Sequence, residues 1–256
     1  MTADDPGITL DWLAAGERHC RDVVATLTDA GAAGPSGLAG WTRAHLVTHL
    51  ARNADALVNL LTWARTGTPT PMYPSAGQRD ADIAAGAGRS AGQLRSDLVA
   101  AADRLAAAVA AMSDDAWRAS VRTAQGREIP AAGVPWLRVR EVWVHAADLD
   151  LGGTLADTPG SVVDALLDEV TATVTARDPE ARARLRATDR QRVWIIGRDA
   201  GGSNGSGESA GTDPGRPVEL AGATWQLLGW LIGRSGPDDL AVSPAGATAP
   251  VPPRWI

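Results

Sequence analysis

Apolar residues recur at spacings of three and four in four segments of the N-terminal part of the chain, and this pattern constrains the fold most strongly. The spacing places the apolar side chains on one face of an α-helix, which must then pack against a neighbouring helix. Long connections separate the segments, and the connection over 66–80 is rich in proline. Together these features predict a four-helix bundle. The four predicted helices are centred on 10–27, 46–61, 94–112 and 135–151.

The sequence pattern changes after the Gly-rich segment 152–161. A further helical segment, 161–177, is followed by short segments typical of strands and by one more helix. The expected strands are 183–189, 192–199, 217–223 and 240–244, the expected helix is 224–236, and the Gly- and Ser-rich segment 200–215 predicts a flexible loop. We therefore expect an α+β protein with two domains: a helical bundle over 1–155 and a smaller C-terminal α/β domain over 156–256.

Composition and charge argue against several classes of function. The formal net charge is −6 and basic residues are not clustered, so nucleic acid is not an expected partner. No apolar run approaches the ~20 residues of a membrane span, and the acidic N-terminal segment is unlike a signal peptide. The single cysteine, Cys20, can form neither an internal disulfide nor a Cys-rich zinc site. We expect a cytoplasmic protein that contacts no membrane.

The fourth predicted helix carries polar residues on the face that should be buried. At about 100° per residue, His145 lies about 40° from Glu141, and Asp148 lies about 20° away on the other side. Leu137 and Val144 share this face. Glu141 and His145 are four positions apart, so they point the same way and can offer two ligands to one metal ion. A buried carboxylate beside a buried imidazole is costly unless it is paired or bound to a metal.

The second predicted helix offers a third ligand. His45 and His49 are also four positions apart, but His49 lies closer to the apolar face and His45 lies at its rim. Two imidazoles and one carboxylate with an open position describe a catalytic zinc site, and iron, manganese or nickel could use the same donors. A hydrogen-bonded network in the core, without any metal, is the alternative that the spacing leaves open.

Several segments resemble the mycothiol-dependent maleylpyruvate isomerases, which belong to a DinB-like superfamily of metal-binding four-helix bundles. These segments are GWTRAHLVTHLARNADAL, GTPTPMY, TAQGREIPA, WLRVREVWVHAADL, LIGRSG and the terminal PPRWI, and they follow one another along nearly the whole chain. The resemblance implies zinc ligands at His49, Glu141 and His145. It also implies mycothiol as a thiol cofactor and a functionally important arginine, Arg234, which would reach a cleft between the domains.

Four further residues are candidates for binding the substrate or the thiol. Arg79, Gln125 and Arg127 lie in segments that share the resemblance, and Tyr73 lies in the proline-rich connection. Asp148 has no assigned role, because a carboxylate is not expected to reach back to an imidazole in the preceding turn of its own helix. Pairing with an arginine of another helix is the alternative for Asp148.

The resemblance implies a small-molecule substrate, maleylpyruvate, which is isomerised to fumarylpyruvate in gentisate catabolism. Direct rotation about the cis double bond is prohibitive, so a nucleophile must add first and leave after the rotation. A thiolate suits this reversible addition, and we expect an external thiol at a metal ion rather than Cys20. Arg234 would bind a substrate carboxylate. A mycothiol S-transferase or detoxification enzyme, or a non-catalytic metal-binding module, are the alternatives; a monomer is expected.

Overall fold

The computed structural model describes residues 6–197 and 217–251 of the chain. The chain divides into two compact units, Met1–Thr154 and Leu155–Ile256, which are described here one at a time. The predicted loop over 200–215 lies outside the described residues, as does the terminal PPRWI segment.

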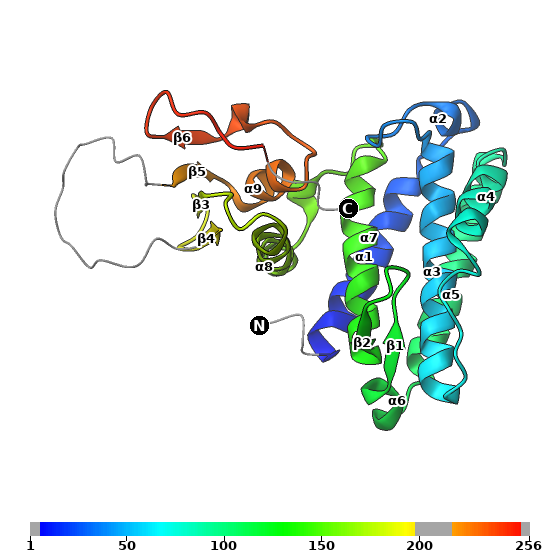
Figure 1. Ribbon diagram of the computed structural model, residues 1–256. Coiled ribbons are helices and arrows are strands. Elements are labelled where there is room, and N and C mark those ends of the chain that lie inside the picture. Colours follow the sequence, from blue (N-terminus) through cyan, green and yellow to red (C-terminus); the bar gives the residue numbers. More distant parts are fainter. Residues whose placement is uncertain (1–5, 198–216, 252–256) are drawn as a thin grey trace. The chain divides into compact units, whose positions relative to one another are not determined.

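Four long helices form the first unit (Figure 1). Helix α1 packs mainly on α7, and α3 packs on both α5 and α7. The four helices agree with the four predicted segments, so the bundle expected from the apolar spacing is present. Their bounds are α1 Pro6–Ala25, α3 Arg43–Thr66, α5 Ala91–Ala110 and α7 Val134–Asp148.

Side chains fix the ends of these helices. The hydroxyl of Ser90 accepts a hydrogen bond from the backbone N–H of Gln93, whose side chain returns to Ser90, as the capping-box spacing predicts. Thr42 and His45 form the same arrangement at the start of α3. Helix α3 ends at Gly67, which has a left-handed φ of 72° that is unfavourable for residues with a Cβ atom.

Short elements that were not predicted from the sequence fill the connections of the bundle. The proline-rich connection contains a helix, α4, where only an irregular crossover was expected. Its start is capped by Ser75, whose hydroxyl accepts from the N–H of Gln78. The additional elements are α2 Asp29–Ala33, α4 Ala76–Gly86, α6 Asp114–Arg118, the antiparallel strands β1 Ser120–Arg122 and β2 Glu128–Pro130, and the 3-10 turn η1 Ala131–Gly133.

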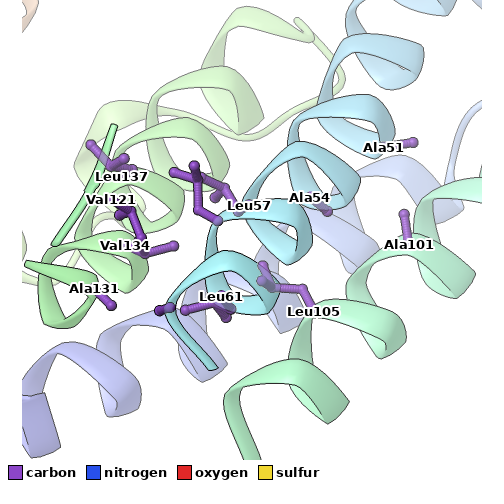
Figure 2. Packing of buried hydrophobic residues seen from close by; sticks show 12 residues of the cluster. Ala51, Ala54, Leu57, Leu61, Ala101, Leu105, Val121, Ala131, Val134 and Leu137 are labelled. Atoms are coloured by element: carbon purple, nitrogen blue, oxygen red, sulfur yellow. The ribbon is translucent and has the colours of Figure 1, made fainter. Parts of the chain in front are cut away.

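The core of the bundle is a continuous cluster of leucine, valine and alanine side chains. Figure 2 shows Leu57 of α3 pointing toward Leu137 near the start of α7, whereas Leu105 of α5 lies on the other side of α3. Fully burying a side chain of this size contributes about 1.5–3 kcal/mol. This packing holds α3 and α7 in a fixed relation, on which the site described below depends.

A buried charge network crosses the same bundle. Arg138 of α7 is fully buried, and its Nε donates to Glu17 Oε1 at 2.7 Å. Its Nη1 donates to the carbonyl of Leu50 at 2.7 Å and to Asn53 Oδ1 at 3.0 Å. Burial alone would lower the pKa of Arg138, but Glu17 outweighs burial and raises it. This network explains why Glu17 interrupts the apolar spacing of α1 and why Asn53 lies on the buried face of α3.

The second unit is built on a four-stranded mixed sheet with the order β4-β3-β5-β6. Strands β3 and β5 are parallel, with Leu185 opposite Leu220, whereas the outer pairs are antiparallel. Helix α8 packs on β4, and α9 packs on β3 and β5. The bounds are η2 Leu155–Asp157, α8 Gly160–Arg177, β3 Ala183–Ala187, β4 Val193–Ile196, β5 Val218–Gly222, α9 Thr224–Leu231, η3 Pro237–Asp239 and β6 Ala241–Ser243. A mostly helical chain with a small mixed sheet confirms the predicted α+β class.

Candidate metal centre

Three side chains from two helices of the bundle converge on one point. His49 comes from α3, and Glu141 and His145 come from α7. The Nε2 atom of His49 lies 2.9 Å from Glu141 Oε2, and the Nε2 atom of His145 lies 3.2 Å from the same oxygen. One ligand atom from each residue lies within 4.8 Å of the other two, a spacing that could hold a metal ion.

Helix geometry and bundle packing both contribute to this convergence. Glu141 and His145 share a face of α7 because they are four positions apart. His49 joins them across the contact between α3 and α7, and its ring meets the ring of His145 edge-on, with centroids 5.2 Å apart. His45 lies outside the cluster, since its Nδ1 is 2.7 Å from the Thr42 hydroxyl at the helix start. The angular argument therefore separated the two histidines as the structure does.

Asp148 reaches the imidazole of the preceding turn, contrary to the expectation from the sequence. Its Oδ2 lies 2.8 Å from His145 Nδ1, and both side chains are buried. Residues three apart on a helix are neighbours, so this contact is sterically accessible. The backbone of Asp148 is also held, because Gly37 donates its N–H to the Asp148 carbonyl at 2.6 Å. A proton on Nδ1 leaves Nε2 of His145 free to bind a cation.

The hydrogen bonds of the cluster set its charges. Burial alone would lower the pKa of His145, but the hydrogen bonds to Asp148 and Glu141 outweigh it and raise this pKa to about 9. At His49 burial dominates and lowers the pKa. The pKa of Glu141 lies well below its usual range, because hydrogen bonds from both histidines outweigh burial. Without a bound cation, these pKa shifts favour an ionised Glu141, a protonated His145 and a neutral His49 at neutral pH.

The proline-rich connection and α4 bring two of the expected binding residues to this cluster. Arg79 Nη2 lies 3.5 Å from His49 Nδ1, and the Arg79 guanidinium carbon lies 6.0 Å from the centroid of the Tyr73 ring. Burial raises the pKa of Tyr73, and the nearby Glu141 carboxylate acts in the same direction. The Trp41 ring also lies next to His49, with ring centroids 5.4 Å apart.

Of the other three candidates, two belong to the first unit and one belongs to the second. Gln125 and Arg127 are exposed in the turn between β1 and β2, where Ala124 donates its N–H to the sulfur of Met72. Arg234 is half-buried just after α9, and its Nη1 donates to the carbonyl of Ile232 at 2.9 Å. Functional roles for these three residues stay predictions.

The donor set fits a divalent cation. Two imidazole nitrogens and one carboxylate oxygen are ligands that zinc and several other divalent metals accept, and three protein ligands leave a position for another group. Cys20 supplies no fourth ligand and no nucleophile, because burial raises the pKa of its thiol to about 12.

Among residues 6–197 and 217–251, no helix is long and apolar enough to cross a membrane.

A helical bundle with a buried cluster of two histidines and one glutamate, followed by a small α/β unit, defines a class of proteins that could bind a metal ion in the bundle. The family model described as the mycothiol maleylpyruvate isomerase N-terminal domain matches residues 13–150. The chain belongs to this family.

Solved structures extend the similarity beyond the bundle. Crystal structures of a mycothiol-dependent maleylpyruvate isomerase and of its histidine-to-alanine mutant each cover 100% of both chains. Each is 32% identical to this chain, with a TM-score of 0.86. A comparison with curated protein sequences gave no match. The similarity therefore includes the second unit as well as the bundle.

Proposed function

We propose that the protein is a mycothiol-dependent isomerase that converts maleylpyruvate to fumarylpyruvate. The observation that carries this proposal is the similarity over the whole chain to a solved enzyme of that activity, at 32% identity. The convergence of His49, Glu141 and His145 supplies a site in which such chemistry could occur. The same proposal places the reaction in gentisate catabolism and in the cytoplasm, because a free thiol cofactor persists in a reducing compartment.

His49, Glu141 and His145 are the proposed ligands of a divalent metal, with zinc as the first candidate. When bound, such a cation supplies Lewis acidity that lowers the pKa of a thiol in its open position. Glu141 brings the negative charge that a cation requires in a buried site. Asp148 holds one proton of His145 on Nδ1, so that Nε2 can bind the cation once it has lost its own proton.

The chain itself offers no nucleophilic thiol among its side chains. Cys20 is the single cysteine, it is fully buried, and its pKa of about 12 leaves it protonated at neutral pH. Reversible addition to the double bond therefore calls for an external thiol, in line with the name of the similar enzyme. The role of the protein is then to bind the thiol and the enedioate next to each other.

Arg234 is the proposed partner of a substrate carboxylate. Its planar guanidinium can bind a carboxylate through two hydrogen bonds, and negative charge shifts within the substrate during the addition. A contact that becomes stronger as this charge develops stabilises the transition state more than the bound substrate. Such a contact raises the rate and does not only improve substrate binding. Replacing Arg234 by lysine tests this distinction, because a loss of kcat at nearly unchanged KM is expected for such a contact.

The decisive assay mixes the purified protein with mycothiol and maleylpyruvate and follows the absorbance of the enedioate. We expect conversion to fumarylpyruvate that depends on both the protein and the thiol. Thiol transfer to an electrophile without isomerisation, or no reaction, would contradict the proposed activity. A control without thiol shows whether any side chain of the protein can serve as the nucleophile.

A further inference from the structure

The two histidines of the cluster differ in what faces their second ring nitrogen. For His145 this atom, Nδ1, faces the acceptor Asp148 Oδ2 at 2.8 Å. For His49 the atom faces Arg79 Nη2 at 3.5 Å. A guanidinium group can only donate hydrogen bonds, so Arg79 cannot replace the carboxylate that His145 has.

If His49 binds a metal ion, its contact with Arg79 brings two hydrogen-bond donors together. Its Nε2 faces the cluster, 2.9 Å from Glu141 Oε2, so this nitrogen is the one that would bind a cation. A neutral imidazole that binds a cation through Nε2 carries its proton on Nδ1. Both Nδ1 of His49 and Nη2 of Arg79 then carry hydrogens, and an acceptor is needed beside both of them.

The separation of the two nitrogens suits a shared oxygen atom. A hydrogen-bond acceptor lies about 2.8–3.0 Å from each donor. Two nitrogens 3.5 Å apart can both lie at this distance from one oxygen. A carboxylate oxygen is the strongest acceptor for such a pair, because its charge strengthens both hydrogen bonds.

Charge and access favour the same ligand. Arg79 is partly exposed, at 32% of its side-chain surface, so an anion can approach it from solvent. The Tyr73 ring lies 6.0 Å from its guanidinium carbon, and Asp80 accepts from its Nη1 at 2.9 Å. Asp80 is mostly exposed, and the Nη1 contact leaves Nη2 directed to His49. A side-chain hydrogen bond also links Arg79 to Tyr73, so the guanidinium is held beside the cluster with Nη2 next to His49.

We infer that Arg79 and the Nδ1–H of His49 form a binding point for one carboxylate of an enedioate substrate. This inference rests on the proposed function for the identity of the substrate, but the site itself needs only a carboxylate. One carboxylate held here lies next to a metal ligand, so the double bond of a short enedioate lies close to the cation. Arg79 is then a substrate-binding residue contributed by the bundle itself.

Calorimetric titration of maleate, a cis-enedioate, into the metal-loaded protein measures its binding affinity. No thiol is present in this experiment. We expect Arg79→Ala to weaken maleate binding about tenfold or more, since a charge-assisted pair of hydrogen bonds is lost. Arg79→Lys is expected to lie in between. The matched control is Arg118→Ala, which removes an exposed arginine on the same unit and should bind maleate as the wild type does. Maleamide, the neutral diamide, should bind equally to wild type and Arg79→Ala.

Several outcomes would overturn the inference. Equal maleate affinity of the wild type and Arg79→Ala would do so, and so would absence of maleate binding by the wild type. Loss of bound metal in Arg79→Ala would also count against it, because Arg79 would then support the metal site. In the isomerase assay, Arg79→Ala should raise KM far more than it lowers kcat. A wild type that binds maleate through Arg79 but isomerises nothing would contradict the proposed function alone.

Discussion

The carboxylate of Asp148 lies 2.8 Å from Nδ1 of His145, inside the bundle and on the side of the ring opposite Glu141. This pair is buried, so neither group exchanges its partner for water. Removing the carboxylate by Asp148→Ala should lower the affinity for the metal by about 10–100-fold, because His145 loses the partner that fixes its ring and tautomer. Asp148→Asn, which keeps an oxygen acceptor, should lose less. Competition with a chelator measures both affinities.

The same pair predicts how the stability of the metal-free protein depends on pH. The folded-state pKa of His145, about 9, lies above the usual value of 6.5. A raised pKa contributes stability that is fully present below about pH 6.5 and is lost as the pH rises through about 9. The free energy of unfolding, measured with denaturant, should therefore fall between pH 7 and 9.5. Asp148→Asn should flatten this slope, and an unchanged slope would contradict the assignment of His145.

Metal binding should release a proton for the same reason. His145 must lose a proton before its Nε2 can bind a cation, since a protonated imidazole has no free lone pair. The apparent affinity for the metal is thus expected to rise about tenfold per pH unit below a pH of about 9 and to level off above it. Calorimetry in buffers of different ionisation enthalpy counts the protons released. Release of no proton at pH 7 would show that His145 is already neutral.

The Arg138 network predicts a large loss of stability from one substitution. Arg138→Met removes the donor that the Glu17 carboxylate and Asn53 Oδ1 share, which should cost about 3–5 kcal/mol. The double variant Arg138→Met/Glu17→Leu should recover most of this loss, because the uncompensated charge is removed. Arg104→Ala serves as the control, since Arg104 pairs with Asp55 at the surface and should cost about 1 kcal/mol or less. Equal losses for Arg138 and Arg104 would refute the buried network.

Gly86 lets α4 pack closely on α3, near His49. A Cβ atom at this position would lie 2.2 Å from Thr48 Cγ2, so Gly86→Ala requires α4 to shift. We expect a loss of about 1–3 kcal/mol in unfolding free energy and, because α4 carries Arg79, a higher KM for the substrate. Thr48→Ala should partly rescue the variant. Gly77→Ala on the same helix has nothing closer than 3.9 Å, so it should leave KM unchanged and should raise rather than lower the unfolding free energy.

The convergence of the two histidines and the glutamate was predictable, because helix periodicity is a local property of the sequence. Glu141 and His145 are four positions apart, and the angular position of His49 distinguishes it from His45 before any partner is known. The contact between Asp148 and His145 was not predictable in this way, because it depends on the side-chain rotamer of Asp148. The Asp148 side chain is buried, and its backbone carbonyl accepts a hydrogen bond from Gly37, which is distant in sequence.

The parts of the fold that the sequence analysis missed depend on contacts between distant residues. Proline and glycine in 66–80 indicate a loop, yet α4 begins at Ala76, where α3 offers a surface for it to pack on. Glu17 reads as a break in the apolar pattern of α1, and only the tertiary structure supplies Arg138, 121 positions away. A pattern of spacings contains no information about such partners.

The central claim is that His49, Glu141 and His145 hold a metal on which thiol-dependent isomerisation depends. Metal analysis of purified wild type and His49→Ala, together with the isomerase assay of both, tests it most directly. His45→Ala is the control, because His45 bonds with Thr42 at the helix start and lies outside the cluster. We predict a stoichiometric divalent metal and activity in wild type and His45→Ala, and loss of both in His49→Ala. A wild type without stoichiometric metal, or an active His49→Ala variant, would contradict the claim.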